Sequence, residues 1–130
     1  MARTEPFDEL SQKYDDWFDR FASVYESELA AVREALPADA KGVEIGVGTG
    51  RFAAPLGIME AVEPSEEMAR GARGRGVTVH KGIAENLPLP DHTYDCALMV
   101  TTICFLDDPD KAIEEMLRVI KKDGRIILGF

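Results

Sequence analysis

Three glycines at alternate positions follow a short apolar run, and this stretch constrains the fold more than any other. The run is 43–45 and the glycines are Gly46, Gly48 and Gly50. The pattern predicts a buried strand, a tight turn and a helix that starts near residues 51–54. Glycine tolerates positive φ, and its missing Cβ lets a ligand lie against the backbone. The turn amides and the helix N-terminus then offer donors to a polar or anionic group.

The glycine spacing separates the classes of nucleotide-binding loop. A dinucleotide-binding turn has the pattern G-x-G-x-x-G, whereas here Arg51 stands where the last glycine belongs. A phosphate-binding P-loop needs Gly-Lys followed by Ser or Thr, and this stretch has none. The spacing therefore disfavours a nicotinamide-dependent oxidoreductase. A glycine-rich turn that binds nothing stays open as an alternative at this point.

Length and composition indicate one globular domain over residues 1–130. Of the residues, 45% are hydrophobic and 30% are charged, which suits a single core below the size at which chains usually divide. No apolar run approaches the roughly 20 residues that cross a bilayer. The N-terminal residues lack the apolar core of a signal peptide. We therefore expect a cytoplasmic protein with no membrane partner.

The formal net charge of -9 argues against a nucleic-acid partner, because no basic stripe is available to neutralise phosphates. The nearest such cluster is Arg70, Arg73 and Arg75, which is set among glycines and is interpreted as a solvated helix end and loop.

Cysteine and histidine usage predicts no metal site. Cys96 and Cys104 both lie in apolar surroundings, which favours buried free thiols. His80 and His92 are scattered, and their spacing from the cysteines matches no ligand set.

Periodicity predicts an N-terminal helical part over 1–37 and an α/β core over 42–130. The expected strands are 43–45, 58–63, 77–80, 94–101 and 125–130. Ser65 and Asp108 are N-cap residues of two intervening helices, and the second helix is expected to close at Gly124 with Lys121 and Lys122 near its end. The 94–101 run is almost wholly apolar, so burial on both faces in a parallel sheet is expected. The prediction is a doubly wound α/β sheet.

The N-terminal helix carries an aromatic stripe at spacings of three and four, with Asp15 among the acids on its other faces. A stripe of this kind most often packs into the core, and we favour that interpretation. The alternative is that the helix covers a cofactor pocket, with Tyr14 as the residue that faces the ligand.

An acid ends the second predicted strand. Glu63 at that position can accept hydrogen bonds from both hydroxyls of an adenosine ribose. The alternative role is to stabilise the N-terminus of the next helix, but Glu66 and Glu67 already supply acids there. We therefore interpret Glu63 as a ligand-binding residue.

Four motifs occur in order and together resemble the S-adenosylmethionine-dependent methyltransferases of the type 11 family, which have a Rossmann-like fold. They are Glu-x-Gly-x-Gly-x-Gly at 44–50, Glu-Pro-Ser-x-x-Met at 63–68, Gly-x-Ala-Glu-x-Leu-Pro at 82–88, and Tyr-Asp at 94–95 before an apolar strand. The resemblance covers the chain from about residue 42 to its end.

The resemblance implies S-adenosylmethionine as the cofactor and assigns contacts to specific positions. The loop from Gly46 through Val47 and Gly48 to Gly50 would follow the methionine part, with Glu44 beneath it. Glu63 would hold the ribose. The remaining implied contacts are Pro64, Ala84 and Glu85 around the adenine, and Val100 and Thr101 near the methionine amine and the transferred methyl. Ile83 stands where the family usually has an acid.

By the same resemblance, the reaction is an in-line displacement of the sulfonium methyl by a small-molecule acceptor. Such a transfer depends mainly on proximity and alignment. No residue set in the sequence identifies a general base, and the catalytic residues are left unassigned.

The number of expected strands bears on two remaining questions, namely how the sheet is completed and whether the chain is an active methyltransferase. The family's sheet has seven strands, whereas this sequence ends after the fifth expected strand. An apolar strand at a sheet edge exposes unpaired backbone groups. We expect either a truncated chain or a homodimer formed through that edge. A non-catalytic cofactor-binding or dimerisation module is the alternative to a methyltransferase.

Overall fold

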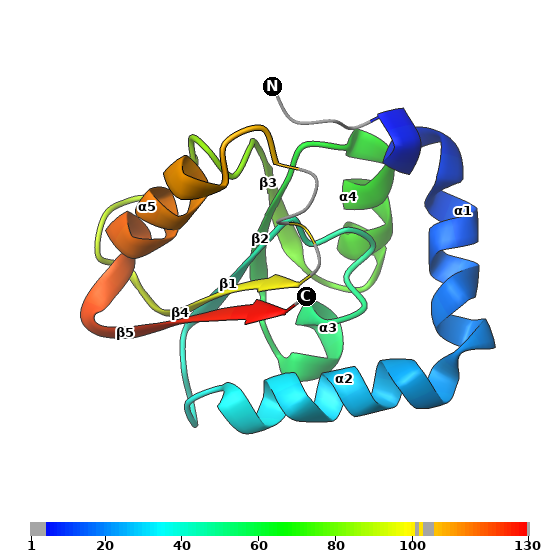
Figure 1. Cartoon of the computed structure of the whole chain (residues 1–130), viewed down its shortest axis with the longest axis horizontal. Coiled ribbons are helices and arrows are strands. Elements are labelled where there is room, and N and C mark those ends of the chain that lie inside the picture. Colours follow the sequence, from blue (N-terminus) through cyan, green and yellow to red (C-terminus); the bar gives the residue numbers. More distant parts are fainter. Residues whose placement is uncertain (1–4, 101, 103–105, 130) are drawn as a thin grey trace.

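Five parallel strands form one sheet in the order β3-β2-β1-β4-β5 (Figure 1). The computed structural model describes residues 5–100, 102 and 106–129. The strands are β1 Gly42–Ile45, β2 Glu60–Glu63, β3 Thr78–Lys81, β4 Tyr94–Val100 and β5 Ile120–Gly129. The order reverses between β1 and β4, which marks the switch point where open α/β sheets bind ligands. The predicted Rossmann-like α/β fold is confirmed.

Helices cover both faces of the sheet. They are α1 Glu5–Arg20, α2 Ala22–Ala35, α3 Ala53–Leu56, α4 Glu66–Gly74 and α5 Pro109–Val119. Figure 1 shows α1 and α2 as the two arms of an L around α3 and α4, while α5 lies apart from them. Strands β4 and β5 point toward the side on which α1 lies. In the part of the chain that is described, no helix is long and apolar enough to cross a membrane.

The core has two parts because successive strand residues face opposite sides of the sheet. On β4, Leu98 and Val100 pack with α1, α2, α3 and α4, whereas Ala97 and Met99 pack with α5 and the 82–90 loop. All four side chains are buried. The predicted burial of this strand on both faces is therefore confirmed.

Both predicted N-caps are present. The Ser65 hydroxyl accepts a hydrogen bond from the Met68 amide at 3.3 Å, and the Asp108 carboxylate accepts one from the Lys111 amide at 3.2 Å. Each satisfies a helix N–H that has no intrahelical partner.

The C-terminal end of α5 differs from the prediction. The helix stops at Val119 instead of reaching Gly124, and Ile120 already pairs with Tyr94 as the first residue of β5. The amides of residues 92 and 93 donate to the carbonyls of Arg118 and Val119 at 2.9 and 2.8 Å. A distant loop therefore satisfies the last carbonyls of the helix. Lys121 and Lys122 belong to the strand, so they do not cap the helix.

Two charged residues of α5 fix the loop that precedes β4. The buried Glu115 carboxylate accepts from the Leu87 amide at 2.8 Å and from two nitrogens of Arg118. The Arg118 guanidinium also donates to the carbonyls of Leu87 and Leu89 and to Asp91. One arginine thus satisfies several loop groups that the sheet cannot reach.

We expect Arg118→Met to lower the free energy of unfolding by about 2 to 3 kcal/mol, because the nearly buried Glu115 carboxylate loses its charge partner. The matched control is Arg70→Met, which removes an exposed pair with Glu67 and should cost about 0.5 kcal/mol or less. Urea unfolding followed by circular dichroism measures both. Equal losses in the two variants would contradict this account of the loop.

Candidate functional site

The glycine loop after β1 adopts the backbone conformation that its sequence predicts. Gly46, Gly48 and Gly50 have φ values of +73, +59 and +87°, a region that other residues rarely enter. Space is limited as well. A Cβ on Gly46 would lie 2.5 Å from the Thr102 side chain, and one on Gly48 would lie 3.0 Å from the Tyr14 hydroxyl. Both conformation and contact therefore require glycine.

The Glu63 carboxylate joins this loop to the end of β2. Its Oε1 accepts from the Gly48 amide at 2.8 Å, and its Oε2 accepts from the Ser65 amide at 3.0 Å. The Val62 carbonyl accepts from the Gly46 amide at 2.8 Å, which adds a backbone link. These two amides fix the orientation of the carboxylate. The side chain is 6% exposed.

Glu44 lies in β1 and is 2% exposed. It accepts a hydrogen bond from the Ala53 amide, while its Oε1 has no hydrogen-bond partner among the described residues. Burial raises the pKa of Glu44 well above its ordinary value, and the negative charge of Glu63 acts in the same direction. A buried acceptor of this kind favours a positively charged or donating group nearby.

Tyr14 brings α1 to the glycine loop. Its hydroxyl lies close to Gly48, and burial raises its pKa, with further contributions from the charges of Glu44 and Glu63. The structure therefore brings Tyr14, Glu44, Gly48 and Glu63 together, and their contact with a cofactor stays a prediction.

The aromatic stripe of the N-terminal helix serves two purposes. Phe18 is buried at 6% exposure and packs against Tyr25 and Phe52. Trp17 and Phe21 are 41% and 40% exposed, so the stripe is not wholly core. The favoured core interpretation applies to Phe18. Tyr14 lies beside Gly48, and the alternative, that it faces a ligand, stays a prediction.

An acid of α1 that we predicted outside the aromatic stripe ties this helix to the loop. The Asp15 carboxylate accepts from the Thr49 hydroxyl at 2.7 Å and from Arg51 Nε at 2.9 Å, and Arg75 lies 3.5 Å away. Burial opposes ionisation here, but the Thr49 and Arg51 hydrogen bonds hold the pKa of Asp15 below its usual value. Arg75 is thus part of a cluster, whereas Arg70 and Arg73 pair with surface acids. In the sequence, the opposite charges of Asp15, Arg51 and Arg75 are the one feature that could have indicated this cluster.

Two other predicted residues lie on the 82–90 loop. Ala84 is buried with the strand residues that face α5. Glu85 accepts from the amides of Asp107 and Asp108 at 3.0 and 3.2 Å, so it holds the segment where α5 begins. Its second oxygen is buried with no hydrogen-bond partner in the described part of the chain. Glu85 therefore has a structural role that the sequence did not indicate.

The remaining predicted residues flank the strand ends. Pro64 lies half-buried between Glu63 and the helix cap Ser65. Val100 ends β4, the neighbour of β1 in the sheet. Thr101 lies outside the described residues. Val47 is buried within the loop at 3% exposure.

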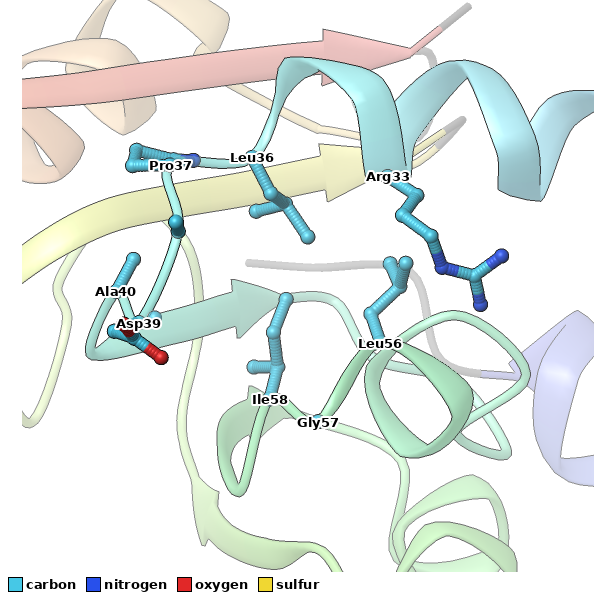
Figure 2. A pocket seen from close by; sticks show the side chains of 10 residues that line it. Arg33, Leu36, Pro37, Asp39, Ala40, Leu56, Gly57 and Ile58 are labelled. Carbon is cyan, nitrogen blue, oxygen red and sulfur yellow. The ribbon is translucent and has the colours of Figure 1, made fainter.

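Two hollows lie on different sides of the molecule. One of about 380 Å³ is lined by residues before β1 and between α3 and β2, at the amino ends of the strands. Figure 2 shows Leu36, Leu56 and Ile58 pointing into it, with Arg33 and Asp39 on opposite sides. The other, of about 290 Å³, shares Tyr14 with the glycine loop. Only the second lies with the predicted site.

Within residues 5–100, 102 and 106–129, no group of three or more His, Cys, Asp or Glu side chains could hold a metal ion. Cys96 is a buried free thiol, and burial raises its pKa to about 11, so it is poorly suited to bind a metal as thiolate.

The strand order, the glycine loop at the switch point and the acid that ends β2 define a Rossmann-like domain of the kind that binds an adenosine-containing cofactor. The sequence profile of the methyltransferase domain family, type 11, matches residues 43–128. This chain belongs to that family of S-adenosylmethionine-dependent methyltransferases.

Relatives agree with this assignment. A crystal structure from Thermotoga maritima, of an S-adenosylmethionine-dependent methyltransferase described as a possible histamine N-methyltransferase, superimposes with a TM-score of 0.91 at 56% identity and covers 97% of this chain. An uncharacterized protein of Methanocaldococcus jannaschii is 44% identical over 95% of the chain. A malonyl-[acyl-carrier protein] O-methyltransferase of Methylococcus capsulatus is 34% identical over 79% of it. The chain spans 60%, 60% and 42% of these proteins, respectively.

We expect the stability of this chain to fall as pH rises above the unfolded pKa of Glu44, near 4.5. In that window the folded carboxyl keeps its proton while the unfolded one loses it, which costs at most about 1.4 kcal/mol per pH unit. Glu44→Gln removes this dependence, whereas the exposed control Glu34→Gln keeps it. Urea unfolding from pH 4 to 8 provides the comparison. Parallel profiles for the wild type and Glu44→Gln would refute the buried-carboxyl account.

Proposed function

We propose that this chain binds S-adenosylmethionine on its glycine loop and transfers the methyl group to a small-molecule acceptor. The observation that carries the proposal is the Glu63 carboxylate, which is held by the Gly48 and Ser65 amides at the sheet's switch point. These hydrogen bonds orient the carboxylate, to which the two hydroxyls of an adenosine ribose would donate.

The residues present fit this cofactor. The three glycines let the loop backbone adopt its positive-φ turn, and Glu63 presents an oriented carboxylate for the ribose hydroxyls. The unpartnered Oε1 of Glu44 lies buried near the loop, where a hydrogen-bonding group of the cofactor's methionine part would satisfy it. Ala84 and Pro64 would border the adenine.

When bound, S-adenosylmethionine supplies a methyl group on a positively charged sulfur, which makes that carbon electrophilic. The chain's own contribution is to align and to exclude water. Glu63 and the glycine loop fix the cofactor's position, and Tyr14 covers Gly48 from α1. The Asp15 cluster holds α1 in that place. No general base is assigned.

Two observations favour a small acceptor. The hollow of about 290 Å³ beside Tyr14 has the size of a small organic molecule. The Thermotoga maritima relative, at 56% identity, is described as a possible histamine N-methyltransferase.

A second candidate is a cofactor-binding module that assembles through β5 and has no activity of its own. Among the described residues no strand pairs with the outer side of β5. Its residues Ile126, Ile127 and Leu128 are only partly buried. An edge of this kind pairs readily with another chain.

Calorimetric titration with S-adenosylmethionine tests the cofactor site. We expect Glu63→Ala to weaken binding at least about tenfold, because a charge-assisted bidentate contact is lost. Glu67→Ala removes the same charge from an exposed position four residues further along and should bind like the wild type. Thermal unfolding of both variants checks that each is folded. Unchanged affinity in a folded Glu63→Ala chain would remove Glu63 from the site.

Light scattering after gel filtration tests the second candidate. A homodimer is expected if β5 pairs between copies, and Ile127→Lys should then shift the mass to that of a monomer, because a charge opposes edge pairing. A wild-type monomer would eliminate assembly through β5. Methylation of even one amine, phenol or thiol acceptor by the purified chain would exclude a non-catalytic module.

A further inference from the structure

The hollow beside Tyr14 lies between the two N-terminal helices and the start of α3. Tyr14, Trp17 and Phe18 come from α1, Glu28 from α2, and Phe52 precedes α3. Figure 1 shows the corner at which α1 and α2 meet, and the hollow is lined by residues of both helices. Its volume of about 290 Å³ suits a small organic group.

The rings that line the hollow meet one another at steep angles. Tyr14, Trp17 and Phe52 each stand edge to face with Phe18, at interplanar angles of 73, 86 and 79°. Phe18 and Phe52 are almost fully buried and form the floor, whereas Trp17 is 41% exposed at the rim. A group in the hollow therefore meets several ring faces and edges rather than one flat surface.

Among the described residues, Glu28 is the one acidic side chain that lines this hollow. It is half-buried, and in the described part of the chain no hydrogen bond or ion pair to its carboxylate occurs. The Glu28 carboxylate thus lies beside four aromatic rings without a partner among the described residues. A cation in the hollow would supply that partner.

Aromatic faces in this cluster already attract a cation. The Arg51 guanidinium lies 5.6 Å from the centre of the Phe18 ring, and its charge is compensated by Asp15 and Asp19. Aromatic walls with one carboxylate are the arrangement that binds organic ammonium groups, because ring quadrupoles and the acid both favour positive charge. An uncharged ligand would gain affinity from contact with the rings but not from the carboxylate.

We infer that this hollow binds the ammonium group of the methyl acceptor, either a protonated amine or a quaternary ammonium. The inference depends on the proposed function, since Tyr14 is the shared wall between the hollow and the glycine loop. An acceptor held in this way is methylated at a different atom, because a charged ammonium has no lone pair to form the new bond. The acceptor is therefore a small molecule with an ammonium group and a separate nucleophile.

Trp17 is the single tryptophan of the chain, so its fluorescence reports on this hollow directly. Titration with choline, with butylammonium and with neohexyl alcohol, the uncharged carbon analogue of choline, separates charge from shape. We expect saturable changes with the two cations, at least about tenfold tighter than with the alcohol. Equal affinity for choline and the alcohol would overturn the inference.

Variants that remove one negative charge or one aromatic ring test where the cation binds. Glu28→Gln should weaken choline binding about tenfold and leave the alcohol unaffected. Glu26→Gln, an exposed acid of the same helix, should change neither affinity. Trp17→Ala, followed by calorimetry, should weaken both ligands. Choline affinity that survives both Glu28→Gln and Trp17→Ala in folded chains would place the cation elsewhere and overturn the assignment.

The two proposals fail in different ways. Loss of S-adenosylmethionine binding in a chain that still prefers choline over its neutral analogue would overturn the methyltransferase function and, with it, the acceptor role of the hollow. Cofactor binding with no preference for charge would overturn the ammonium site alone. Charge preference that depends on Glu28 in a chain that binds the cofactor supports both.

Discussion

The site depends on one buried carboxylate that accepts backbone amides from two segments. Glu63 receives a hydrogen bond from Gly48 in the loop after β1 and one from Ser65 at the start of α4. Charge-assisted hydrogen bonds of this type are about twice as strong as neutral ones. The carboxylate therefore sets the distance between β1's loop and β2's end, and any ligand that bridges them meets a preformed frame.

The N-terminal helix is part of this frame rather than a separate cap. Asp15 connects it to Thr49, which directly follows Gly48, and to Arg51, which directly follows Gly50. Arg75, which follows the last residue of α4, is the third partner of the Asp15 carboxylate. These contacts place Tyr14 beside Gly48, and Tyr14 also lines the aromatic hollow. The proposed cofactor site and the proposed ammonium site thus share one residue of α1.

Local patterns predicted the strands, the N-caps and the acid at the end of β2, because each depends on residues close in sequence. The prediction failed where distant groups decide the outcome. The end of α5 is set by amides of residues 92 and 93, and Asp15 finds partners more than 30 residues away. Glu85, which the family resemblance places at the adenine, also anchors the segment before α5. Such tertiary contacts leave little trace in a single sequence.

The central claim is tested most directly by a titration with S-adenosylhomocysteine in which the chemical shifts of the backbone amides are followed. S-adenosylhomocysteine is the product that remains after S-adenosylmethionine has given up its methyl group. We predict that the largest changes fall on residues 46–50 and 63–65, with little change around the hollow between Arg33 and Ile58 at the amino ends of the strands. Changes centred on that second hollow, or none at saturating ligand in folded protein, would contradict a cofactor site on the glycine loop.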